Sequence, residues 1–190
     1  GSPKQITQSV TRLLLEKLPA YLKTDPLSIQ VMTPQRKGAL GVERLNPLLQ
    51  AELNPPGREK AEKELNGTLF RLGDKVMQVR NNYNLVWELC GRFGIPIETG
   101  EGVFNGDIGI IREINALRET LTVDFDGRSV EYHFKDCEDL DLAYAITIHK
   151  SQGSEYPAVV IPMYQGPQLL MNRNLLYTAV TRAKRCVCLV

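Results

Sequence analysis

The stretch from Asp141 to Pro162, DLAYAITIHKSQGSEYPAVVIP, constrains the fold more than any other part of the chain. Two short apolar runs, 142–146 and 159–161, flank a polar cluster. Continuous apolar runs of this length are typical of strands that are buried on both faces of a parallel sheet. The polar cluster then follows the carboxyl end of a strand, where such sheets bind their ligands. The sequence therefore predicts a parallel α/β domain with a ligand crevice at this stretch.

The polar cluster is rich in hydrogen-bond donors. It contains Thr147, His149, Lys150, Ser151 and Gln152. Backbone N–H groups at the start of a following helix would add more donors for an anion. This chemistry favours phosphate as the ligand, while a solvated loop between two strands is the common alternative for such a pattern.

Composition narrows the class of protein. A chain of 190 residues suffices for one domain with a small insert, and 43% hydrophobic with 24% charged residues suits a globular core. With a net charge of only +1, any contact with nucleic acid has to come from a local basic strip.

No apolar run is long enough for a membrane helix, so we expect a cytoplasmic protein without membrane contact. The four cysteines form no CxxC pair, and we expect no metal site in this chain.

A basic loop follows the first predicted strand. The apolar spacing predicts a helix over 5–22, and residues 29–32 are typical of a strand. The sequence TPQRKG at 33–38 comes next, with Arg36 and Lys37 at the carboxyl end of that strand. The position suits a phosphate contact, and the alternative is a surface loop with two cations.

The middle of the chain has a different pattern from the segments that predict the parallel sheet. Residues 54–66 are rich in proline, glycine and charge, and we expect an exposed connection with one helical turn. We expect a helix-and-loop excursion over 84–102. Short strands follow over 103–134, with a tight hairpin at Asp126-Gly127, and together they predict a small barrel. A loop with a Gly-Pro turn is expected over 163–171, and then a helix that Asn172 caps.

Two segments resemble motifs V and VI of superfamily 1 DNA helicases. TIHKSQGSEY at 147–156 is similar to motif V as found in RecD-like helicases, and NLLYTAVTRAK at 174–184 is similar to their motif VI. TPQRKGALGVERLN, from residue 33, is similar to motif IV. The same family carries segments like GDKVMQ at 73–78, followed by Asn and Tyr, and like VFNGDIG at 103–109.

The resemblance implies a RecA-like, P-loop NTPase-type parallel sheet domain with an inserted SH3-like β-barrel. Residues 1–94 and 137–190 would form the discontinuous second motor domain, and residues 95–136 the barrel. The phosphate-gripping GxxxxGK[ST] loop is absent, because the chain contains no Gly-Lys pair. We therefore expect ATP and Mg²⁺ to be used by a longer parent protein, with neither bound by this chain alone.

The resemblance also implies roles for single residues. Arg182 matches the motif VI arginine and would be the catalytic arginine finger, on the polar face of a helix whose apolar face includes Ala179 and Ala183. The residues expected at ATP are Arg36, Lys37, Gln152, Gly153 and Glu155. The residues expected at DNA are Thr147, His149, Lys150 and Ser151. From the residues alone, the alternative for Arg182 is a solvated arginine on a helix surface. Glu155 could equally be an ordinary surface acid, and His149 a structural histidine.

The function implied is ATP-driven movement on single-stranded DNA and unwinding of duplex in the 5′-to-3′ direction. The partners would be single-stranded DNA, junctions between single and double strands, and the N-terminal motor domain of the same parent chain. This chain alone would be inactive as an ATPase. Two alternatives are the motor half of a conjugative relaxase-helicase, and a non-catalytic module that binds DNA or protein.

Overall fold

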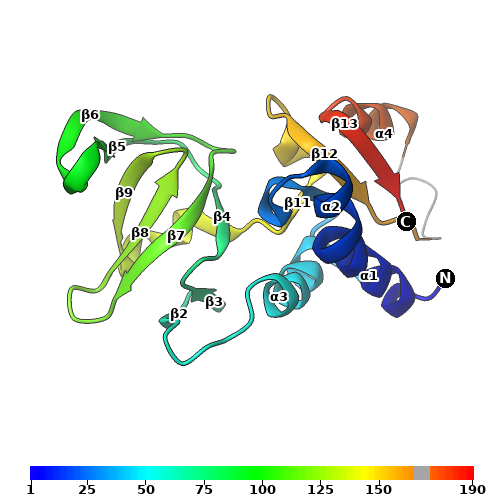
Figure 1. The fold of residues 1–190 in the computed structure, drawn as a ribbon, viewed down its shortest axis with the longest axis horizontal. Helices are drawn as coiled ribbons and strands as arrows, with labels where there is room; N and C mark the ends of the chain where they lie inside the picture. Colours follow the sequence, from blue (N-terminus) through cyan, green and yellow to red (C-terminus); the bar gives the residue numbers. More distant parts are fainter. Residues whose placement is uncertain (165–171) are drawn as a thin grey trace. The chain divides into compact units, whose positions relative to one another are not determined.

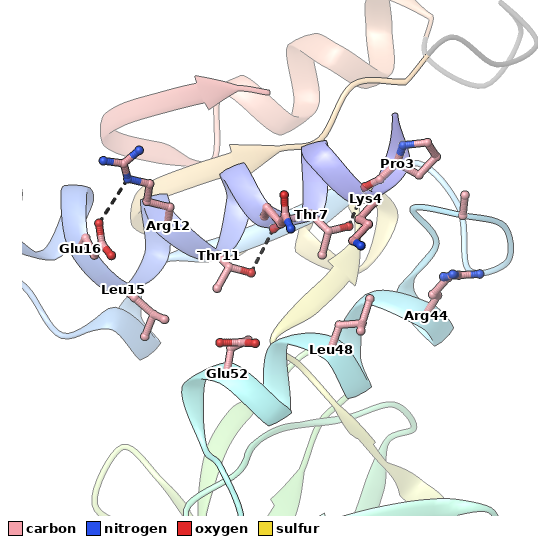
Figure 2. Close-up of a pocket in the computed structure, with 12 residues that line it drawn as sticks. Pro3, Lys4, Thr7, Thr11, Arg12, Leu15, Glu16, Arg44, Leu48 and Glu52 are labelled. Carbon is pink, nitrogen blue, oxygen red and sulfur yellow. Dashed lines mark hydrogen bonds and ion pairs between the residues drawn. The ribbon is translucent and has the colours of Figure 1, made fainter. Parts of the chain in front are cut away.

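The computed structural model describes residues 1–164 and 172–190, which divide into two compact units (Figure 1). Unit 1 consists of residues 1–55 and 144–190, and unit 2 of residues 56–143. The sequence places these boundaries at 94/95 and 136/137 instead. The difference arises because the strands at 75–78, 82–90 and 140–142 pair within the antiparallel sheet and not with the parallel sheet. Of the loop expected over 163–171, residues 165–171 lie outside the described residues.

Unit 1 is built on a four-stranded sheet in the order β11-β1-β12-β13. All three pairings are parallel, which confirms the predicted parallel sheet. The strands are β1 (Gln30–Thr33), β11 (Ala145–Thr147), β12 (Tyr156–Ile161) and β13 (Ala183–Leu189). Every residue of the central strand β1 is buried, as expected for a strand covered on both faces.

Helices cover this sheet. The predicted N-terminal helix is present as α1 (Pro3–Arg12), a π-helical turn (Leu13–Lys17) and α2 (Leu18–Leu22). The turn widens just before Pro19, whose ring cannot sit against the carbonyl four residues earlier. The other two helices are α3 (Val42–Leu53) and α4 (Arg173–Val180). As predicted, Asn172 caps α4, with its Oδ1 accepting from the Leu175 N–H at 2.8 Å.

A side chain of α3 protects the edge of the parallel sheet. The Asn46 amide donates to the Ala145 carbonyl at 3.0 Å, and its oxygen accepts from the Ala145 N–H at 2.8 Å. Asn46 thus continues the ladder beyond β11, where unpaired backbone groups would otherwise be buried.

Unit 2 contains a seven-stranded antiparallel sheet in the order β10-β4-β7-β8-β9-β5-β6. Its strands are β4 (Lys75–Gln78), β5 (Asn82–Cys90), β6 (Pro96–Val103), β7 (Ile108–Asn115), β8 (Thr120–Phe125), β9 (Arg128–His133) and β10 (Leu140–Leu142). The predicted tight turn joins β8 to β9, with φ of 54° at Asp126 and 90° at Gly127. The barrel-type insert is therefore confirmed.

Two local predictions in unit 2 are wrong. Residues 84–102 form most of the long β5–β6 hairpin and not a helix-and-loop excursion. The helical turn expected within 54–66 is absent from that described segment, which ends in β2 (Glu62–Leu65). An Asn66-Gly67 turn joins β2 to β3 (Thr68–Arg71). In this hairpin the buried Arg71 guanidinium donates to Glu62 Oε1 at 2.5 Å.

The core of unit 2 contains a buried tyrosine. Tyr132 is 1% exposed, and its hydroxyl donates to Gln78 Oε1 at 2.7 Å. Burial, followed by the nearby acidic groups, raises the Tyr132 pKa well above its ordinary value near 10. The folded state therefore holds Tyr132 neutral at pH values where the unfolded chain ionises it.

Replacement of Tyr132 by phenylalanine should lower the unfolding free energy by about 1–3 kcal/mol at neutral pH, because Gln78 Oε1 loses its buried donor. Above about pH 10 the unfolded chain releases the Tyr132 proton and the folded chain keeps it. The contribution of Tyr132 to wild-type stability therefore falls as pH rises. The difference in unfolding free energy between wild type and variant becomes smaller. Urea unfolding at neutral pH and above pH 10 measures both values. A difference in unfolding free energy that increases with pH would contradict a buried, neutral Tyr132 hydroxyl.

Candidate nucleotide and nucleic-acid sites

Strand register places the predicted site residues at two opposite edges of the parallel sheet. Thr33 pairs with Thr147 at the ends of β1 and β11, so the segments that follow both strands leave from the carboxyl edge. Tyr156 pairs with Ala183 at the starts of β12 and β13. Glu155 and Arg182 precede those starts and therefore lie at the amino edge. We call these two groups the carboxyl-edge site and the amino-edge site.

The carboxyl-edge site combines cations with hydrogen-bonding groups. His149 is exposed and Lys150 half-buried, in the single 3₁₀ turn that follows Thr147. Arg36 and Lys37 are exposed in the loop after β1, where Arg36 Nε lies 3.8 Å from Glu43 Oε1. The polar turn or short helix predicted after Thr147 is present as this 3₁₀ turn, Ile148–Ser151.

Ser151 differs from its neighbours. It is fully buried, and its hydroxyl donates to the Ile148 carbonyl at 2.5 Å. The structure does not support a DNA contact from this side chain. Ser151 instead closes the 3₁₀ turn that carries His149 and Lys150.

A β-turn leads the chain from the carboxyl edge back to the amino edge. The Ser154 N–H donates to the Ser151 carbonyl at 3.1 Å, with Gln152 at φ −58°, ψ 131° and Gly153 at φ 81°. These angles define a type II turn, which strongly favours glycine at its third position. Turn geometry alone therefore accounts for Gly153, and the exposed Gln152 side chain projects from the turn.

The amino-edge site is a set of paired and partly buried groups. Lys184 Nζ lies 3.3 Å from Glu155 Oε2, and both side chains are largely exposed. The Tyr156 N–H donates to the Arg182 carbonyl at 2.8 Å, which fixes the start of β13 against β12. Burial raises the pKa of the Tyr156 hydroxyl, while a hydrogen bond with Ser154 and the positive charge of Arg182 act in the opposite direction.

Arg182 does not lie on a helix, contrary to the prediction. Helix α4 ends at Val180, the Arg182 N–H closes the last turn on the Ala179 carbonyl at 3.2 Å, and Ala183 already belongs to β13. Its guanidinium donates to Thr181 Oγ1 at 3.3 Å, while its Nε is buried with no hydrogen-bond partner among the described residues. Buried donors are rarely left unpaired, so the Arg182 Nε stands out among the buried polar atoms of the described residues.

The structure therefore brings Glu155 and Arg182 together, and separately Thr147, His149, Lys150, Arg36 and Lys37. It does not bring Arg36 and Lys37 to Arg182. Sequence reasoning missed Tyr156 and Lys184, which hold the amino-edge groups.

Within the described residues, no cluster of three metal-binding side chains occurs. No helix in residues 1–164 and 172–190 is long and apolar enough to cross a membrane.

Comparison with known proteins agrees with this architecture. The family "ATP-dependent RecD-like DNA helicase SH3 domain" matches residues 45–125, and "UvrD-like helicase C-terminal domain" matches residues 142–190. The "ATP-dependent RecD2 DNA helicase" of Deinococcus radiodurans is 39% identical over 161 residues, which cover 84% of this chain and 19% of that protein. The "RecBCD enzyme subunit RecD" of Mycobacterium tuberculosis is 41% identical over 91 residues, 46% of this chain and 15% of that protein.

Solved structures share the fold. The Pif1 helicase from Bacteroides, in complex with ADP-AlF3 and single-stranded DNA, has a TM-score of 0.54 and 20% identity, covering 96% of this chain and 44% of that chain. The parallel sheet, the antiparallel insert and these matches define an α/β helicase fold with an SH3 insert. The chain belongs to the RecD-like helicases of superfamily 1.

Proposed function

We propose that this chain is the second motor domain of a longer ATP-dependent DNA helicase. The two edges of its sheet bind different ligands, ATP at one edge and DNA at the other. The amino-edge site serves ATP held by the N-terminal motor domain of the same parent chain. The carboxyl-edge site binds the phosphates of single-stranded DNA. The observation that carries the proposal is the strand register, which separates Thr147 and Lys150 from Glu155 and Arg182.

At the amino edge, Arg182 acts as the arginine finger. Negative charge spreads over the transferred phosphoryl group, and a cation inserted from a facing domain stabilises it. The half-buried guanidinium with its unpaired Nε supports this role. Glu155 accepts from a ribose hydroxyl once Lys184 releases it, and Gln152 and Gly153 approach the nucleotide from the adjoining turn. The phosphate loop and the Mg²⁺ ligands belong to the N-terminal motor domain.

At the carboxyl edge, Thr147, His149 and Lys150 contact DNA phosphates. Such contacts hold the strand without reading its sequence, as a translocating motor requires. The resemblance places Arg36 and Lys37 at the nucleotide, but both leave the sheet beside Thr147. We assign them to DNA phosphates on this ground. The 5′-to-3′ direction of travel, and unwinding at junctions between single and double strands, rest on the resemblance alone.

The carboxyl-edge assignment predicts a change in salt dependence. Each phosphate contact contributes about 0.7 to the slope of log affinity against log salt for single strands. We expect Lys150→Ala to weaken binding of the chain to oligodeoxythymidine and to lower that slope by about 0.7. Fluorescence anisotropy across a salt series measures both quantities.

The matched control is Lys17→Ala, which removes an exposed lysine from the N-terminal helical segment of the same unit. Its slope should equal the wild-type slope. A Lys150→Ala slope that matches wild type, or an equal fall in Lys17→Ala, would remove the DNA role from the carboxyl edge.

A further inference from the structure

Two segments of unit 2 resemble segments of RecD-like helicases but have no role in the proposed function. These are Asn81-Asn82-Tyr83 and the segment 103–109. The fold joins them: the Asn105 N–H donates to Asn81 Oδ1 at 2.9 Å. The rings of Tyr83 and Phe104 meet edge to face, with centroids 5.7 Å apart and planes at 70°. Residues far apart in the sequence thus form one aromatic surface.

The position of Phe104 is fixed by its own turn. The Phe104 N–H donates to Asp107 Oδ2 at 2.9 Å, and the Asp107 N–H donates to the Phe104 carbonyl at 3.0 Å. The ring lies over Gly102, where a Cβ atom would come within 2.8 Å of the Phe104 Cζ atom and φ is 102°. The ring therefore packs on the Gly102 backbone, at a position where a side chain would clash with it.

Gln78 anchors both segments on the barrel. Its buried side chain donates to the Arg80 carbonyl at 2.9 Å, just before Asn81. Its backbone accepts from the Gly106 N–H and donates to the Asp107 carbonyl, each at 2.8 Å. The aromatic surface is therefore organised before any ligand arrives, which lowers the ordering cost of binding.

The surface is aromatic and amide-rich. Tyr83 is 66% exposed and Phe104 43% exposed. The asparagines at and beside these rings are Asn81, Asn82, Asn84 and Asn105. The nearby Arg80 guanidinium lies within 4 Å of the carboxylates of Glu138 and Asp139, so its charge is offset. Flat rings flanked by amide donors and acceptors are the chemistry that binds unstacked nucleobases, whereas phosphate would need free cations.

We propose that Tyr83 and Phe104 form a stacking platform for the nucleobases of single-stranded DNA on unit 2. The proposal rests on the proposed function, because it concerns the same ligand. It adds a second kind of contact: bases held by rings, in contrast to phosphates held by cations at the carboxyl edge. Stacking releases no counterions, so the two kinds of contact differ in their salt dependence.

The test measures oligodeoxythymidine binding by the 190-residue chain across a salt series. We expect Tyr83→Ala and Phe104→Ala each to raise Kd roughly five- to hundredfold, the range for loss of one base–aromatic stack, with the salt slope unchanged. Tyr83→Phe keeps the ring and should keep the affinity. Phe93→Ala is the matched control, because Phe93 is a 96% exposed aromatic residue of the same unit, at the tip of the β5–β6 hairpin.

Each other outcome overturns the platform. Wild-type Kd in both alanine variants would show that the rings do not touch DNA, as expected if the surface docks a protein. An equal loss in Phe93→Ala would mean non-specific apolar contact, and a slope lowered by about 0.7 would mean a lost phosphate contact. If Lys150→Ala behaves as expected while Tyr83→Ala binds normally, only the platform fails. If the wild-type chain binds no oligonucleotide, the proposed function fails with it.

Discussion

Replacing Arg182 with alanine in the full-length helicase is expected to lower kcat for ATP hydrolysis about a thousandfold or more, the usual effect of removing an arginine finger. The finger acts on charge that develops in the transition state, so kcat should fall far more than KM changes. The fold should tolerate the change, because the structural contact of Arg182 with Tyr156 uses its backbone carbonyl, which alanine retains. Steady-state kinetics measures the change in kcat and KM, and a thermal melt followed by circular dichroism measures whether the domain stays folded.

Two further variants sharpen this result. Arg173→Ala removes an exposed arginine from the first turn of α4 and should keep wild-type turnover. Arg182→Lys retains the charge without the planar fork of donors and should recover only part of the rate. Wild-type kcat in Arg182→Ala, or a melt showing an unfolded domain, would leave the finger assignment without support.

The second large effect concerns the 190-residue chain by itself, which we expect to hydrolyse no ATP. Tight binding of the β- and γ-phosphates needs a GxxxxGK[ST] loop and an acid that holds Mg²⁺. The sequence contains no Gly-Lys pair and therefore no such loop. In the proposed function, Arg182 and Glu155 complete a nucleotide site whose phosphate loop another domain supplies. Turnover should therefore stay at background even when DNA is bound.

Much of the fold could be predicted from local patterns. Val159-Val160-Ile161 is a continuous β-branched run, and it forms the buried end of β12 in the parallel sheet. Asp126-Gly127 gives the tight β8–β9 turn, since both residues tolerate the positive φ that this turn needs. These signals are local, so the surrounding structure does not alter them.

The errors in unit 2 arise where a pattern fits two structures. Leu85 and Leu89 are four residues apart, which suits one face of a helix and equally one face of a strand. Their burial alternates with the exposed Val86 and Glu88, as the β5 strand requires. In 62–65 the charged residues suit a helix, but Asn66-Gly67 is a strong hairpin signal and determines the outcome.

The geometry of the sites depends on tertiary pairing. No glycine or proline ends the helix after Val180, and the sequence pattern continues it through Ala183. Helix α4 ends there because β13 pairs with β12 from Ala183 onward. Strand order and register likewise decide that Arg36 leaves the sheet beside Thr147 and away from Arg182. A residue's type and spacing carry no information about either relationship.

The most direct test of the claim that this chain is one half of a motor is ATP turnover by the purified 190-residue chain with saturating oligodeoxythymidine. Wild type and Arg182→Ala are measured in parallel, so that a contaminating ATPase contributes equally to both. We predict the same background rate in the two proteins. Turnover in wild type that disappears in Arg182→Ala would belong to the chain itself, and it would contradict the assignment of the phosphate loop to another domain.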